Sequence, residues 1–462
     1  MKTVIRGIGQ IVSGAIAAPL LDGDTIVCVD GKITQVGRES QVDADQAATV
    51  IDAHGSTVIP GLIDSHVHPV FGDFTPRQRT VDFLDSEVNG GVTTMISAGE
   101  VHLPGRPRDL VGLKALAVVA ARAYQNFRPS GAKVHAGAPI LELGLTEVDF
   151  VEMARGGVKL VGEIGLGSVR TGHDAAPMVR WAKAHGMTVT IHTGGPSIAG
   201  SSPIDAETVL EADPHVVGHI NGGTTSMSLS EIETLVGHTQ MALEIVHCGN
   251  PRTALQTLRV ARDAGAWSRI ILGNDAPSGT GVVPLGILRT LALLASVGEC
   301  PPETAVAMAT GNAAWVYGLP VGIVAPGREA DLVVCDAPVG SVARTALGAL
   351  SAGDLPGVSM VLITACRDSA GAETPRRRPG RPRSRRARRR GAATDGRHRD
   401  GGRGPRSHAH EDPEARDDRR RAPCRRRSRR RPAGPEGGRG GRDRESLRRA
   451  VRGGPVPAGQ GR

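Results

Sequence analysis

A (β/α)8 TIM barrel beside a small β-sandwich is the fold class that the sequence predicts. Eight apolar strands alternate with helical stretches over residues 56–320, a pattern typical of a parallel barrel covered by helices. Short strands with tight turns occupy residues 1–55 and 321–364, and these two segments are expected to pair as one composite sandwich. Residues 365–462 have no hydrophobic period and are predicted to be a disordered, Arg/Gly/Pro-rich tail.

The sandwich is predicted to begin at the N-terminus. The apolar stretches 25–29 and 33–36 flank Asp30-Gly31, a dipeptide that favours a type I′ hairpin turn because both residues tolerate positive φ. After the barrel strands, a helix is expected near residues 302–317, and short strands then return. The last strand, GVSMVLI at 357–363, is expected to lack a hairpin partner, because the sequence after it has no strand-like pattern.

The barrel prediction depends on eight strands separated by helical stretches such as 175–186. Each strand is a near-continuous apolar run, as expected where both faces of a sheet are buried. The same pattern also fits a doubly wound open sheet, which remains the alternative fold. The strands are expected at residues 56–68, 92–99, 132–141, 158–167, 188–195, 215–222, 241–249 and 269–279.

The tail differs in composition from the rest of the chain. Residues 366–462 carry 32 Arg, no Lys and 12 acidic residues, a net charge of +20, so residues 1–365 carry −11 of the total of +9. Every aromatic residue precedes the tail, the last being Tyr317. A basic arm for nucleic acid is one interpretation. We favour a frame-shifted reading of a GC-rich gene, because the pattern breaks inside a strand, and we therefore expect no nucleic-acid partner.

Cysteine usage and hydropathy indicate the compartment. The six cysteines show no C-x-x-C spacing, which favours a reducing environment. Gly7, Gln10 and Gly14 interrupt the N-terminal apolar run, which argues against a signal peptide. Because no apolar run approaches the ~20 residues that span a bilayer, we expect a cytoplasmic protein without a membrane partner.

Histidines and carboxylates lie at the C-terminal ends of the predicted strands, where barrel active sites are assembled. His66 and His68 end the first strand, and their spacing of two places both imidazoles on one face, where they could hold one metal ion. Four histidines and two carboxylates suffice for two divalent ions, such as zinc or iron. The remaining candidate ligands are Glu163, His192, His219 and Asp275.

These motifs resemble those of the amidohydrolase superfamily, and in particular those of the enamidases. The resemblance extends over roughly residues 1–364 and implies a metal-dependent, ring-opening hydrolase that forms a homo-oligomer. The motifs are VIPGLIDSHVHP, GGVTTMISAG, GEIGLG, IHTGG, GHINGG, GNDAPSGTG and AVAMATGN. The ligands that the resemblance implies are His66, His68 and Asp275 for one ion, His192 and His219 for the other, and Glu163 as the bridge.

The bridging ligand has an alternative in Lys159, because many cyclic amidohydrolases use a carboxylated lysine. Lys159 and Glu163 share a face of the predicted strand, but four residues of strand span about 13 Å. Only one of them can therefore lie at the top of the strand. Glu163, which a Gly-Leu-Gly turn follows, is better placed.

Other polar residues near the strand ends could contact the substrate. Arg77 and Arg79 could pair with a substrate carboxylate, although a solvated loop charge is an equal alternative. His247 and His102 could contact the substrate or support a ligand. His215 opens its strand and is expected at the wrong end of the barrel for catalysis.

The resemblance implies that a small molecule, the cyclic enamide 6-oxo-1,4,5,6-tetrahydronicotinate, is hydrolysed to 2-formylglutarate and ammonia in nicotinate degradation. Asp275 is expected to take a proton from the attacking water and deliver it to the leaving nitrogen. A dihydroorotase-, hydantoinase- or imidazolonepropionase-like activity would use the same ligands and stays an alternative. A non-catalytic scaffold of this fold is the second alternative, and the presence of all six candidate ligands argues against it.

Overall fold

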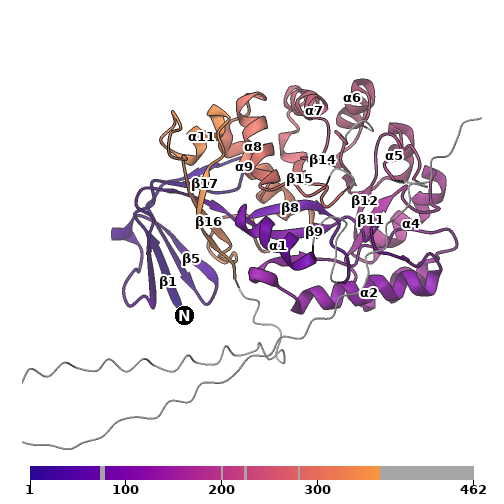
Figure 1. The fold of residues 1–462 in the computed structure, drawn as a ribbon, viewed down its shortest axis with the longest axis horizontal. Coiled ribbons are helices and arrows are strands. Elements are labelled where there is room, and N and C mark those ends of the chain that lie inside the picture. Colours follow the sequence, from indigo (N-terminus) through magenta and orange to yellow (C-terminus); the bar gives the residue numbers. More distant parts are fainter. Residues whose placement is uncertain (73–78, 199–200, 223–225, 279–280, 365–462) are drawn as a thin grey trace, which may run out of the picture. The chain divides into compact units, whose positions relative to one another are not determined.

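The computed structural model describes residues 1–72, 79–198, 201–222, 226–278 and 281–364. The predicted tail and Arg77 lie outside the described residues. Eight parallel strands follow one another in chain order, as predicted. Figure 1 shows part of this arrangement with the helices around it. They are β8 (Leu62–Val67), β9 (Val92–Ser97), β10 (Lys133–His135), β11 (Leu160–Ile164), β12 (Thr188–Ile191), β13 (Val216–Val217), β14 (Ala242–Val246) and β15 (Ile270–Gly273).

The eight strands close into a barrel. β8, β9 and β10 are paired side by side, and β11 to β15 are paired in the order of the chain. Across the junction between β10 and β11, Gly162 N donates to Pro139 O at 3.0 Å. The last strand meets the first where His68 N donates to Ala276 O at 2.9 Å. This closure confirms the barrel over the open-sheet alternative.

Helices connect the strands, and their apolar faces pack on the outside of the barrel to form the main core. Local signals start several of them: Thr146 and Asp149 form a capping box at α3, and Ser228 and Glu231 form one at α6. None of the described helices is long and apolar enough to cross a membrane. The helices are α1 (Thr80–Asn89), α2 (Leu110–Asn126), α3 (Glu147–Arg155), α4 (Gly172–Ala184), α5 (Ala206–Ala212), α6 (Leu229–His238), α7 (Pro251–Asp263), α8 (Gly286–Ser296), α9 (Pro302–Met308), α10 (Gly311–Val316) and α11 (Ala346–Ala352).

Two sheets form the small sandwich, with strand orders β5-β4-β1-β6 and β17-β16-β7-β2-β3. The second sheet joins both ends of the described chain, because β7 pairs antiparallel with β16. At the β4–β5 hairpin, Asp30 and Gly31 have φ of 51° and 81°, as the predicted type I′ turn requires. The strands are β1 (Lys2–Arg6), β2 (Gln10–Val12), β3 (Leu20–Leu21), β4 (Thr25–Val29), β5 (Lys32–Gly37), β6 (Thr49–Asp52), β7 (Thr57–Pro60), β16 (Leu332–Asp336) and β17 (Gly357–Leu362).

The segment predicted as a single first barrel strand, 56–68, is two strands separated at Gly61. A side chain at Gly61 would meet Thr93 Oγ1 at 2.3 Å, so only glycine fits this close approach. Its N–H donates to Asp331 O at 2.8 Å, which ties the start of β8 to the C-terminal part of the sandwich. The sandwich sheet therefore extends to Pro60, beyond the boundary predicted at residue 55.

The region after the barrel differs from the prediction in two places. The helix expected near 302–317 is two helices, because the backbone leaves the helical region at Thr310, where φ is −138° and ψ is −90°. The segment 357–363 has one partner among the described residues, whereas the hairpin partner expected after residue 363 falls outside them. β17 pairs antiparallel with β16, which precedes it in the chain, and the unpredicted helix α11 connects the two. β17 forms the edge of its sheet.

Candidate metal centre

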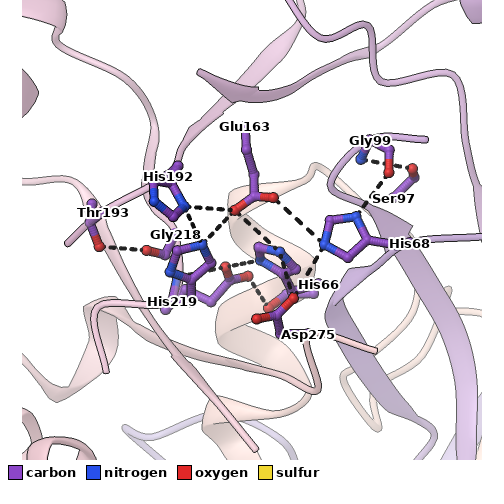
Figure 2. Close-up of polar contacts among 12 residues, drawn as sticks. His66, His68, Ser97, Gly99, Glu163, His192, Thr193, Gly218, His219 and Asp275 are labelled. Atoms are coloured by element: carbon purple, nitrogen blue, oxygen red, sulfur yellow. Dashed lines mark hydrogen bonds and ion pairs between the residues drawn. The ribbon is translucent and has the colours of Figure 1, made fainter. Parts of the chain in front are cut away.

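The six candidate ligands lie at or just beyond the C-terminal ends of five barrel strands, and their side chains point toward a common centre (Figure 2). Five of them are at most 4% exposed. The side chain of Asp275 is 24% exposed, so it is the ligand that solvent reaches most readily. The strands and their ligands are β8 with His66 and His68, β11 with Glu163, β12 with His192, β13 with His219 and β15 with Asp275.

Glu163 lies in the middle of the group. Its Oε1 is 2.6 Å from His219 Nε2, 3.5 Å from His66 Nε2 and 3.9 Å from His192 Nδ1. Its other oxygen, Oε2, is 3.6 Å from His68 Nε2. One carboxylate thus faces all four imidazoles, which is the position that a bridging ligand needs.

Two overlapping groups within the cluster have the spacing of a metal site. In the first, Asp275 Oδ1 lies 3.2 Å from His68 Nε2 and 3.7 Å from His66 Nε2. The second consists of His66, Glu163 and His219. In each group one ligand atom of every member lies within 4.8 Å of the others. His192 belongs to neither group, although its Nδ1 is 3.0 Å from His219 Nε2.

Three of the four imidazoles are oriented as metal-bound histidines are, because oxygen acceptors hold their outer nitrogens, whereas the outer nitrogen of His219, Nδ1, has no hydrogen-bond partner among the described residues. His68 Nδ1 donates to Gly99 O at 2.9 Å, and His192 Nε2 donates to Gly195 O at 2.9 Å. A carbonyl oxygen only accepts, so the proton of the neutral ring lies on the outer nitrogen. The inner nitrogen then presents its lone pair to the centre.

Two buried atoms at the centre have no hydrogen-bond partner among the described residues, namely His66 Nε2 and Glu163 Oε1. A buried polar group left in this state costs about 1–3 kcal/mol. A divalent cation between them would satisfy both, and imidazole with carboxylate is a donor set that such cations accept. The residues therefore fit a metal ion.

The electrostatics of the cluster favour a cation. Burial alone lowers the pKa of His66, but the charges of Glu244 and Glu163 outweigh it and hold that pKa well above its usual range. Burial alone raises the pKa of Glu163, but the charges of His66 and His219 outweigh it and hold that pKa well below its usual range. The negative charge that keeps a proton on His66 would equally favour a metal ion that competes with the proton.

The backbone is strained at two of the six positions. His219 and Asp275 have φ of 30° and 55°, in the left-handed region that few residues other than glycine adopt. Such conformations cost about 1–3 kcal/mol each and persist where the surrounding structure enforces them. Here the hydrogen bond from Asp275 N to His66 O, at 2.9 Å, holds one of them in place.

Several other candidates lie away from the centre. Lys159 is exposed at the start of β11, so it cannot serve as the bridge in place of Glu163. His247 lies 3.2 Å from Thr290 Oγ1 of α8 through its Nδ1, and thus points into the helix layer rather than the lumen. Arg79 is exposed and lies just before α1.

Two further histidines are placed clearly. His215 was expected at the end of the barrel away from the candidate ligands. It lies just before β13 and accepts a hydrogen bond from Val189 N, near the start of β12. His102 lies at the edge of the candidate centre, with its ring 5.6 Å from that of His68, and it bonds the backbone of Pro277. Burial and the neighbouring His68 lower the pKa of His102 to about 4, so its ring is neutral near pH 7.

Among the residues that contact the cluster and that the sequence-based reasoning missed is Glu244 on β14. Its Oε2 accepts the hydrogen bond of His66 Nδ1 at 2.6 Å. A signal was present, because Glu244 is a charged residue in the middle of the otherwise apolar run Ala242–Val246. A carboxylate placed inside a fully buried strand is rare unless it has a partner.

Comparisons with known proteins agree with this geometry. The model of the amidohydrolase family matches residues 57–356. An enamidase of Eubacterium barkeri is 55% identical over 362 residues, which cover 78% of this chain and 94% of that protein. A crystal structure of enamidase has 53% sequence identity and a TM-score of 0.76, covering 81% of this chain and 99% of that one.

A more distant relative also aligns over most of its own length. The imidazolonepropionase of Geobacillus thermodenitrificans is 26% identical over 401 residues, covering 72% of this chain and 91% of that protein. The family match spans the barrel and part of the sandwich, and the enamidase similarity spans nearly the whole of that relative. The chain belongs to the amidohydrolase family, and within that family it is similar to the enamidases.

Proposed function

We propose that this protein is a binuclear metal-dependent hydrolase that converts 6-oxo-1,4,5,6-tetrahydronicotinate to 2-formylglutarate and ammonia in nicotinate degradation. The observation that carries the proposal is the convergence of six ligand side chains on one buried centre. The substrate follows from the 55% identity to an enamidase. A cytoplasmic location and a homo-oligomeric state stay predictions from the sequence.

The centre is proposed to hold two divalent ions, zinc, iron or one of each. The first ligand group matches one position, and the second group shares Glu163 and His219 with the other position but includes His66 in place of His192. The central place of Glu163 supports its role as the bridge. Imidazole and carboxylate ligands suit both metals. Ions bound there supply Lewis acidity, which activates water and polarises a substrate carbonyl. The first position would be held by His66, His68 and Asp275, and the second by His192 and His219.

Asp275 is proposed as the group that moves the proton. Burial alone raises its pKa, but the adjacent His68 ring and the charge of His66 outweigh burial, so the net pKa lies below its usual value. The carboxylate is therefore ionised near pH 7 and can accept a proton from the attacking water. Because Asp275 is also the most exposed ligand, the same oxygen can then deliver that proton to the lactam nitrogen.

The reaction consumes two waters. The first adds its oxygen to the lactam carbonyl carbon, the C–N bond breaks, and the nitrogen receives a proton and leaves as an enamine. The enamine tautomerises to an imine, and the second water hydrolyses this imine to an aldehyde and ammonia. Arg77 and Arg79, in the segment that follows β8, are proposed to pair with the substrate carboxylate, because guanidinium binds carboxylate through two parallel hydrogen bonds.

A substrate panel tests this proposal. Metal-loaded protein is incubated with the tetrahydronicotinate lactam, a saturated lactam, a hydantoin and an imidazolone, and ammonia, aldehyde and remaining ring are measured. We expect turnover of the first compound with equal amounts of ammonia and aldehyde. Turnover of the imidazolone or hydantoin alone would instead place the protein among the other cyclic amidases. Failure of metal-analysed protein to hydrolyse any ring would support the non-catalytic scaffold.

A further inference from the structure

Glu244 lies beneath the candidate ligands and has no part in the mechanism proposed above. It is 0% exposed. Its Oε2 is 2.6 Å from His66 Nδ1 and also accepts from His219 N at 3.3 Å. Its Oε1 accepts from Ser65 Oγ at 2.5 Å. One buried carboxylate therefore contacts two histidines that the metal assignment gives to different ions.

We propose that Glu244 is a positioning residue that orients both halves of the metal centre. The inference rests on the metal site of the proposed function. It assigns to Glu244 two separate tasks: fixing the ring of His66 and fixing the backbone of His219. Loss of its charge should therefore weaken binding at both metal positions rather than at one.

The first task follows from the chemistry of the hydrogen bond. An ionised carboxylate only accepts, so the bond of Glu244 requires a proton on His66 Nδ1. In the neutral ring this leaves the lone pair on Nε2, the atom that faces Glu163 at 3.5 Å and Asp275 at 3.7 Å. The contact also prevents the ring from turning. A carboxylate behind a metal-binding imidazole raises the basicity of the ring and strengthens its hold on the ion.

The second task concerns a strained residue. His219 has φ of 30°, a conformation that needs support from outside the strand. The hydrogen bond from His219 N to Glu244 supplies such support at the residue that turns its imidazole toward Glu163. Glu244 thus acts on His66 through the side chain and on His219 through the backbone.

The surroundings explain why a carboxylate at this depth needs a function. Below it, toward the N-terminal ends of the strands, the lumen is filled by apolar side chains that include Ile63, Ile96 and Ile271. An ionised group in such a place is costly unless hydrogen bonds or charges compensate it. The donors of Ser65, His66 and His219 provide that compensation, and two of them, His66 and His219, are candidate ligands.

The test compares Glu244→Gln with Glu142→Gln. Glu142 is also buried, at 5% exposure, and its carboxylate accepts from Ser168 N at 2.8 Å without contacting a candidate ligand. Chelator-treated proteins are titrated with Zn²⁺ alone, and their Co²⁺ complexes are examined by visible absorption. For Glu244→Gln we expect affinity about 10–100-fold weaker at both positions and a changed Co²⁺ spectrum. Glu142→Gln should match the wild type in both measurements.

The outcomes separate this inference from the proposed function. Wild-type affinity and spectrum in folded Glu244→Gln would overturn the role of Glu244 and leave the metal centre intact. Absence of Zn²⁺ binding in the wild type would overturn both. If Glu244→Gln does not fold, Glu244→Asp, which retains the charge but shortens the side chain, is measured in its place. Glu244→Asp should show a weaker affinity than the wild type, and an unchanged affinity would contradict the inference.

Discussion

Lys133 joins the barrel to the sandwich through a buried ion pair, and its removal should strongly destabilise the protein. Its side chain is 7% exposed at β10, and its Nζ lies 2.7 Å and 2.8 Å from the two carboxylate oxygens of Asp331, which is 0% exposed. Glu329 Oε2 is 2.6 Å from the same nitrogen. Asp331 Oδ1 also accepts from Thr364 N at 2.8 Å.

Lys133→Met keeps the apolar stem of the side chain and removes its charge. The carboxylate of Asp331 would then be buried with one backbone donor and no counter-ion. Breaking a buried pair in this way costs about 3–5 kcal/mol. The free energy of unfolding, measured by urea titration, should fall by that amount. Activity of the folded fraction should persist, because the candidate ligands lie at the opposite ends of the strands.

Two control variants make the reasoning refutable. Lys183→Met removes an ion pair of similar length, 2.7 Å to Asp213, whose side chains are 29% and 70% exposed, and it should cost less than about 1 kcal/mol. Adding Asp331→Asn to Lys133→Met should restore part of the lost stability, because the uncompensated charge is gone. A loss below 1 kcal/mol in Lys133→Met, or no recovery in the double variant, would contradict this explanation.

Three further predictions concern the site, acid stability and the tail. His66→Ala should lower kcat/KM at least about 10³-fold while circular dichroism stays unchanged, whereas His247→Ala should retain activity within a few-fold, because His247 faces α8. Burial raises the pKa of Asp149, but Lys114 outweighs this and the net pKa lies below 3.8. Its stabilising contribution is therefore present above pH 3.8 and lost as pH falls further, so wild type and Asp149→Asn should differ in unfolding free energy at pH 7 and converge in acid. A chain ending at residue 364 should keep hydrolytic activity and lose any salt-sensitive binding to nucleic acid; loss of activity would show that the tail has a role.

The barrel could be predicted from the sequence because its signals are local. Eight apolar runs alternate with helical stretches, and five of these runs end in candidate ligands, at the end of the barrel where active sites are assembled. The spacing of His66 and His68, and the choice of Glu163 over Lys159, follow from the rise of a strand. The structure brings these positions together at one centre, with Lys159 exposed elsewhere.

Features that depend on contacts between distant segments were not predictable in the same way. The break at Gly61 depends on the close approach of Thr93. The partner of β17 is β16, which precedes α11 in the chain. With seven residues, α11 is too short for its helical period to be recognised in the sequence. In the sequence, Glu244 is only an isolated charged residue within an apolar strand. Its role depends on its contact with His66, which comes from a different strand. The direction of His247 depended on the packing of α8, which the sequence pattern leaves open.

The frame-shift interpretation of the tail stays a prediction, because residues 365–462 lie outside the described residues. Thr364, the last described residue, donates through its Oγ1 to Gly31 O at 2.9 Å, so the sandwich retains its fold up to that point. Resequencing the gene should reveal a frame after codon 363 that encodes an Arg-poor, strand-like segment. If no frame does so, the tail is genuine.

The binuclear centre can be tested most directly by anomalous diffraction from crystals loaded with zinc or iron, with peaks recorded at the absorption edge of each metal. We expect two ions bridged by Glu163 and separated by about 3.5–4 Å. The ligands should be His66, His68 and Asp275 at one ion and His192 and His219 at the other. A single ion, or a carboxylated Lys159 between two ions, would contradict the assignment.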